Sequence, residues 1–117
     1  MKDVSAYLKH IREAIAKIEK YTKDGRKHFM EDTMIQDSVI RNLEIIGEAT
    51  KNLPTDLRKS YPKVPWRSIT GMRNVLIHEY FGVDLDIVWK VVVQRLPVLK
   101  RHVSVMLAKN KRSKKKA

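Results

Sequence analysis

Three polar side chains within eight residues of this sequence could act on a phosphodiester. Arg73 is a permanent cation whose planar guanidinium binds phosphate through several N–H donors. His78 can accept or donate a proton near neutral pH, and Tyr80 adds a phenol two residues later. One side chain that neutralises the phosphate and one that moves the proton are a minimal set for cleaving this bond without a metal ion.

The spacing of the two charged groups restricts how they can meet. Arg73 and His78 are five positions apart, which is about 140° around a regular α-helix, so they would not share a face. The helix ends between them, or they face a cleft from different elements, or they meet across a dimer. The alternative without chemistry is a helix C-terminus, where His78 caps the last carbonyls and Arg73 makes a surface ion pair.

The elements that must position these residues are predicted by apolar residues at intervals of three and four. One helix follows the N-cap Asp3 and runs to about Thr22, with Gly25 as its C′ residue. After a short turn at residues 26–30, a second helix spans about 32–52, with Gly47 packed closely against a neighbour. The residues predicted to be buried in these two helices are Val4, Leu8, Ile11, Ile15 and Ile18, and Met34, Ile35, Val39, Leu43 and Ile46.

Prolines 54, 62 and 65 interrupt the middle of the chain and leave room for one helical turn at Thr55–Lys59. Trp66 is expected to close one end of the core, and a helix that starts near Ser68 carries Arg73. Asp84 is a plausible N-cap for the last helix, in which Pro97 frees the carbonyl of Val93 and introduces a kink. Residues 89–93 alone resemble a strand, but helical spacing on both sides favours a helix. The residues predicted to face the core from this helix are Leu85, Val88, Val92, Leu96, Leu99, Val103 and Met106.

These patterns predict an all-α fold, an antiparallel four- or five-helix bundle in a single domain of residues 1–108. Residues 109–117 are expected to form a basic, disordered tail. The chain has 25 basic and 13 acidic residues, and six of the basic residues lie in this tail. The remainder is still basic, so a polyanionic partner is plausible, although a solubilising tail on a mildly basic surface would explain the same charge.

Composition excludes several kinds of site. The chain has no cysteine, and its four histidines lack the spacing of metal ligands, so we expect no metal site and no cofactor. The N-terminus has no apolar segment of the signal-peptide type, and no apolar run approaches the roughly 20 residues of a membrane span. We therefore expect a soluble, cytoplasmic protein.

The pattern R-x-x-x-x-H-x-Y, formed by Arg73, His78 and Tyr80, resembles the HepT-like toxins of the HEPN superfamily. The resemblance extends from about Asp3 to about Leu107 and so covers nearly the whole chain outside its tail. Its further matches are the Ile-Ile-Gly-Glu-Ala run at residues 45–49, Trp66 and Ile69 before the motif, and Val83, Asp84 and Trp89 after it.

The resemblance implies a metal-independent endoribonuclease that acts as the toxin of a two-gene toxin–antitoxin pair. The 2′-hydroxyl of RNA would attack the adjacent phosphate and leave a 2′,3′-cyclic phosphate and a 5′-hydroxyl. His78 would move the proton, Arg73 would bind the scissile phosphate, and Asn74 would support them. The resemblance further implies a homodimer whose two motifs line one cleft. It also implies an antitoxin, a minimal nucleotidyltransferase that attaches AMP to Tyr80; alternatively, Tyr80 packs its ring against Trp66 or Phe81.

The polar stripe and the activity of the protein each have two interpretations. The second long helix carries a polar stripe formed by Asp37, Arg41, Glu44 and Glu48. This stripe is either a solvated face or a charged wall of the cleft that holds the motif. Glu48 is the residue of the stripe that we expect to support the cleavage site. The protein could also be a non-catalytic HEPN module that binds a nucleotide or RNA, or a subunit of a nucleotidyltransferase complex. A phosphate-binding histidine and a proton-transfer histidine look alike in sequence.

Overall fold

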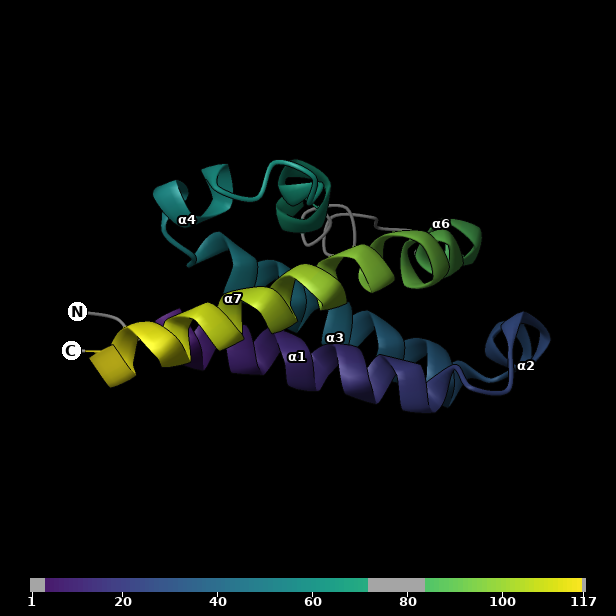
Figure 1. The fold of residues 1–117 in the computed structure, drawn as a ribbon. Helices are drawn as coiled ribbons and strands as arrows, with labels where there is room; N and C mark the ends of the chain where they lie inside the picture. The colour runs from purple at the N-terminus through teal and green to yellow at the C-terminus, as the bar shows by residue number, and fades with distance from the viewer. Residues whose placement is uncertain (1–3, 72–83, 117) are drawn as a thin grey trace.

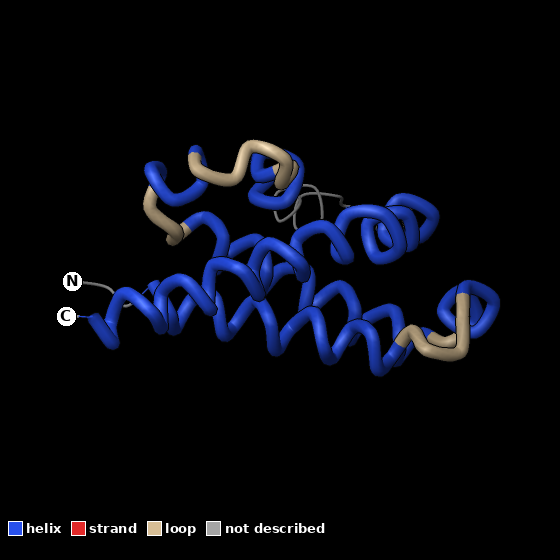
Figure 2. Tube along the Cα trace, in the orientation of Figure 1, coloured by secondary structure: helices blue, strands red, loops and turns tan. Residues whose placement is uncertain are grey.

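The computed structural model describes residues 4–71 and 84–116, and the side chains of residues 4–71 and 84–110. Every regular element in this part is helical, which confirms the all-α prediction (Figures 1 and 2). The elements are α1 (Val4–Tyr21), α2 (Arg26–Glu31), α3 (Thr33–Lys51), α4 (Thr55–Lys59), a helical segment at 66–71, α6 (Leu85–Lys90), the π-helical turn η1 (Val91–Arg95) and α7 (Leu96–Lys116).

The three long helices lie side by side and form the body of the bundle (Figure 1). α1 is antiparallel to α3 and α7 and contacts both of them. The apolar stripes predicted from the sequence supply the core, in which the following residues are buried: Leu8, Ile11, Ile15 and Ile18 of α1, Val39, Leu43 and Ile46 of α3, and Leu96, Leu99, Val103 and Met106 of α7. Helical periodicity alone therefore identified most of the residues that hold the bundle together.

Met34 was predicted to be buried, and this prediction is wrong because its side chain is 78% exposed. The reason lies in the helical register. Met34 is seven positions before Arg41, so the two share a face of α3, and Arg41 is exposed to solvent. The core face of α3 passes instead through Val39, Leu43 and Ile46, with Ile35 partly buried at its start.

Gly25 was predicted to be the C′ residue of α1, and this prediction is wrong. α1 ends at Tyr21, a turn of three residues follows, and Gly25 is the N-cap residue of α2 with φ at +92°. Its N–H donates to the carbonyl of Thr22 at 3.0 Å. The glycine is thus needed for the reversal into α2, because L side chains rarely adopt this φ.

The last helix begins as predicted, because the Asp84 carboxylate accepts from the backbone N–H groups of Asp86 and Ile87 at 3.0 and 3.4 Å. The chain remains helical through residues 89–93, so the strand alternative is wrong. The helix axis changes direction near Pro97 (Figure 1), where the backbone forms η1 and the N–H of Leu96 donates to the carbonyl of Val91. This longer π-type bond lets the helix continue beside a proline that cannot donate.

The π-helical turn shifts the core stripe by one residue. Val91 is buried, whereas Val92, which regular spacing placed in the core, is only partly buried. The helix then continues through Lys116, and the disorder of the tail at 109–117 stays a prediction. Lysine and arginine are good helix formers, and their charge is favourable near a helix C-terminus, which accounts for the extension. The domain limit at residue 108 remains a prediction.

Replacing Leu99 by alanine is expected to lower the free energy of unfolding by about 2–5 kcal/mol, because Leu99 is fully buried among the three long helices and its loss leaves a cavity. Val105 on the same helix is 44% exposed and provides the control. Val105→Ala should change stability by less than about 0.5 kcal/mol. Urea unfolding followed by circular dichroism measures both, and equal effects would contradict this description of the core.

Candidate functional site

The motif residues Arg73, Asn74, His78 and Tyr80 lie outside the described residues, so their roles remain predictions. What the structure describes are the two helical segments that flank the motif. One segment ends at Gly71, and α6 begins directly after Asp84. Both segments pack against the bundle, and their contacts determine where residues 72–83 must start and end.

The segment before the motif is anchored by apolar burial and by one indole. Ile69 is buried with 1% exposure, and Val64 is buried just before the helical segment. Trp66 packs against the core, and its Nε1–H donates to the carbonyl of Tyr61 at 3.0 Å. The Thr70 hydroxyl donates to the Trp66 carbonyl at 2.9 Å. Trp66 therefore closes this part of the core, as predicted.

The segment after the motif is anchored through α6. Val88 is buried, and the ring of Trp89 packs against that of Phe29 in α2 with 5.4 Å between the ring centroids. An ion pair between Arg26 and Asp86 joins α2 to α6 at the surface. The described chain thus stops at Gly71 and resumes at Asp84, in two segments that both pack against the bundle.

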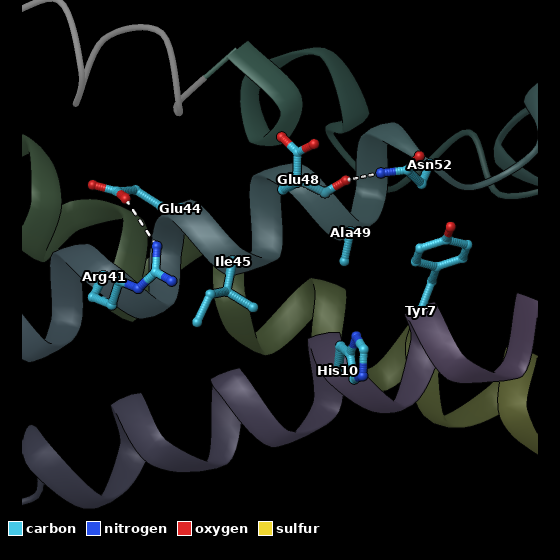
Figure 3. A pocket seen from close by; sticks show the side chains of 8 residues that line it. All are labelled: Tyr7, His10, Arg41, Glu44, Ile45, Glu48, Ala49 and Asn52. Atoms are coloured by element: carbon cyan, nitrogen blue, oxygen red, sulfur yellow. Dashed lines mark hydrogen bonds and ion pairs between the residues drawn. The ribbon is translucent and has the colours of Figure 1, made fainter.

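Glu48 is the one predicted site residue that the structure describes. It is exposed on α3 and lines a pocket of about 310 Å³ with Arg41 and Glu44 (Figure 3). Its carboxylate points to the side of α3 on which the helical segment 66–71 lies (Figures 1 and 3). Its backbone carbonyl accepts from the Asn52 side chain at 2.8 Å. The placement is compatible with a supporting role beside the motif and does not by itself establish one.

The rest of the polar stripe behaves differently. Arg41 is paired with Glu44 at 3.5 Å, an exposed interaction of the kind that contributes only tenths of a kcal/mol. Asp37 is exposed and lines a neighbouring hollow that Arg41 also borders. The stripe thus provides both a solvated surface and part of a pocket wall.

The opposite wall of this pocket was missed by the sequence reasoning. Tyr7 and His10 of α1 point into it (Figure 3). The pattern that could have identified them is a second stripe on α1, offset from the apolar one, in which residues recur at intervals of three and four: Tyr7, His10, Ala14, Lys17 and Tyr21. His10 had been considered only as a metal ligand.

Within the described ranges, no group of three or more metal-ligating side chains comes together. A search of the same residues for a helix with the length and hydropathy of a bilayer span finds none.

The described part of the chain is an all-helical domain. A model of the family described as "Ribonuclease HepT-like" matches residues 11–106, a range that includes the whole motif, and the chain belongs to this family.

Individual relatives carry related names. A Methanocaldococcus jannaschii protein named "Gamma-glutamylcyclotransferase and putative RNase" is 49% identical over 97% of this chain, which spans 53% of that relative. A Thermococcus cleftensis protein named "Probable ribonuclease HepT" is 48% identical over 80% of this chain and 86% of its own length. The "mRNA nuclease HepT" of Shewanella oneidensis is 27% identical over 84% of this chain and 91% of its own. No solved structure matches the chain.

Asp84→Ala is expected to lower the free energy of unfolding by about 1 kcal/mol, because the first N–H groups of α6 lose the carboxylate that accepts from them. Asp84→Asn is the matched control, since asparagine caps a helix about as well as aspartate. Urea titration of both variants tests whether the cap secures the return of the chain to the bundle. Equal losses in the two variants would show that the charge, and not the cap, is what stabilises this end.

Proposed function

We propose that this protein is a metal-independent endoribonuclease and that it acts as the toxin of a toxin–antitoxin pair. The observation that carries the proposal is the family match over residues 11–106, because it includes Arg73, His78 and Tyr80 in their expected order. The names of the relatives agree on ribonuclease activity, and one of them specifies mRNA. The basic excess of the chain favours a polyanionic substrate.

The proposed mechanism needs two groups at one phosphate. A base deprotonates the 2′-hydroxyl, whose oxygen attacks the adjacent phosphorus, and the 5′-oxygen leaves with a proton; the products are a 2′,3′-cyclic phosphate and a 5′-hydroxyl. We assign the proton transfer to His78 and the stabilisation of the developing phosphorane charge to Arg73. Asn74 orients substrate or Arg73, and Glu48 supports the site from α3.

Pairing of two chains would bring the two motifs together and would remove the difficulty that Arg73 and His78 do not share a helical face. The surface of α6 and η1, which follows the motif, supports this proposal because it exposes two large apolar residues. Ile87 is 53% exposed and Val93 is 48% exposed. Apolar side chains of this size are often buried in homodimer interfaces.

Arg73→Ala and His78→Ala are each expected to lower RNA cleavage by roughly 10²-fold or more, the usual contribution of a positioned acid–base or charge-stabilising group. Both variants should remain helical, because the described core is built from aliphatic side chains of other segments. Cleavage of labelled RNA in the presence of a chelator measures the effect, and growth on expression in bacteria measures toxicity. Wild-type cleavage by either variant would refute the assignment. RNA binding without cleavage by the wild type would favour a non-catalytic module.

Tyr80→Phe is expected to remain toxic but to escape neutralisation by a minimal nucleotidyltransferase. An AMP group on the Tyr80 phenol would place a phosphodiester anion near Arg73, where it would compete with the RNA phosphate for the same cation. Tyr7→Phe is the matched control, since it removes a phenol from the pocket on α1. Mass spectrometry after co-expression with the nucleotidyltransferase shows whether Tyr80 carries AMP. A neutralised complex with unmodified Tyr80 would show that the partner acts by blocking the site.

A further inference from the structure

A second pocket lies at the other end of the bundle from α2, where the start of α1, the end of α4 and the C-terminal half of α7 meet (Figure 1). Its volume is about 320 Å³, at the lower end of the roughly 300–1,000 Å³ typical of small-ligand sites. Leu57 and Met106 give it an apolar floor, and Tyr61 and Lys109 give it polar groups. Glu48, the predicted site residue that the structure describes, does not line it.

Tyr61 is the central side chain of this pocket. It is half-buried, and its ring contacts the edge of His102 with 5.9 Å between the centroids and 85° between the planes. The ammonium group of Lys109 lies 5.7 Å from the centroid of the same ring. A partly exposed aromatic ring beside a lysine is the combination with which proteins bind unpaired nucleotides, since the base stacks on the ring and the cation binds the phosphate.

The charge around the pocket is mostly positive, although Asp3 and Asp56 each precede a residue that lines it. Residues 57–71 include Arg58, Lys59, Lys63 and Arg67 and no acidic residue. Residues 91–117 include nine lysines and arginines and no acidic residue. The pocket between α1 and α3 differs, because Glu44 and Glu48 line it. An anionic ligand is therefore favoured in the Tyr61 pocket over the pocket between α1 and α3.

Three basic side chains of η1 and α7 share one face of the helix. Arg95, His102 and Lys109 follow each other at intervals of seven, so they lie on one side of the helix about 10.5 Å apart. Arg95 belongs to η1, close to the point where the chain returns from the motif, and Lys109 belongs to the Tyr61 pocket. A flexible polyanion could follow this line from one end of α7 to the other.

We propose that the Tyr61 pocket is a binding site for an unpaired nucleotide of single-stranded RNA, separate from the cleavage site. On binding, the Lys109 ammonium moves from above the Tyr61 ring to the adjoining phosphate, and one base stacks on the ring face that it leaves. A phosphate further along the strand binds Arg95 of η1. The inference deepens the proposed ribonuclease function, on which its choice of RNA rests. It predicts that the enzyme prefers RNA with an unpaired segment beyond the cut, since bases in a duplex cannot reach the ring.

Binding should be measured with a fluorescently labelled 12-nucleotide oligouridine by anisotropy, in a chelator and in the His78→Ala background so that the probe stays intact. Tyr61→Ala should weaken binding by roughly tenfold, because the stacking surface is lost. Tyr61→Phe keeps the ring and should stay within about twofold of the parent. Lys109→Ala should weaken binding and lower the slope of log Kd against log salt by about 0.7, the value for one phosphate contact on a single strand.

Lys27→Ala is the matched charge control, because Lys27 is an exposed lysine of α2 at the opposite end of the bundle (Figure 1). It should alter Kd and the salt slope less than Lys109→Ala does. Equal effects of the two substitutions would reduce the role of Lys109 to bulk charge and overturn the proposal. Unchanged binding by Tyr61→Ala would overturn it too. If Tyr61→Ala fails to fold, RNA binding by Lys109→Glu is compared with RNA binding by Lys27→Glu, since both lysines are exposed. Equal effects of these two substitutions would overturn the proposal.

A cleavage assay separates this inference from the proposed function. If the wild type binds the oligonucleotide through Tyr61 but never cleaves RNA, the nuclease assignment fails and the nucleotide site stands. If the wild type cleaves RNA and Tyr61→Ala keeps the same KM for a substrate with an unpaired segment, the nucleotide site fails alone. A fully paired substrate should show no dependence on Tyr61 in either binding or cleavage.

Discussion

The apolar contact of α1 with both α3 and α7 is the constraint on which the rest of this structure depends. Leu8, Ile11, Ile15 and Ile18 of α1 are buried almost completely, so this helix cannot move without exposing aliphatic surface on two neighbours at once. Burial of such side chains is the dominant favourable term in folding. Because the core is satisfied by aliphatic stripes alone, the polar residues of the chain are left available for surfaces and pockets.

The flanks of the motif show how this core positions a polar segment. Ile69 and Trp66 secure the chain before residue 72, and Val88 and Trp89 secure it after residue 83. The anchors on both sides are large apolar or aromatic residues, while the motif carries an arginine, a histidine and a tyrosine. The two segments that flank the motif are therefore held by apolar and aromatic packing.

The two pockets differ in charge, and this difference follows from where carboxylates occur in the sequence. The pocket between α1 and α3 has Glu44 and Glu48 on its wall, together with Arg41. The Tyr61 pocket is formed by the start of α1 and by residues 57–61 and 106–110, and the last two stretches contain no acidic residue. At physiological salt, charges act on one another over about 8–10 Å before they are screened. Anionic ligands would therefore prefer the Tyr61 pocket to the pocket between α1 and α3.

The sequence by itself determined the helices, the core stripes and the family, because period, caps and motif are local properties of the chain. The cap at Asp84, the helical turn at Thr55–Lys59 and the burial of Leu8, Ile11, Ile15 and Ile18 in α1 were predicted correctly, whereas Val4 is only partly buried. Met34 was not, because the first apolar residue of a helix need not share the face of those that follow. Gly25 was assigned to the end of α1 instead of the start of α2, because a glycine indicates a chain reversal but not which of the two helices it belongs to.

Only the tertiary structure decided which polar side chains share a pocket. Tyr7 and His10 line one pocket with residues of α3 because α1 and α3 pack antiparallel. Tyr61 meets Lys109 because the connector after α4 lies near α7. The π-helical turn before Pro97 is also a tertiary result: a proline predicts a disturbed helix, but packing selects the form that keeps both Val91 and Leu96 buried. Contacts between residues distant in the chain depend on how whole helices dock, and no local pattern encodes that arrangement.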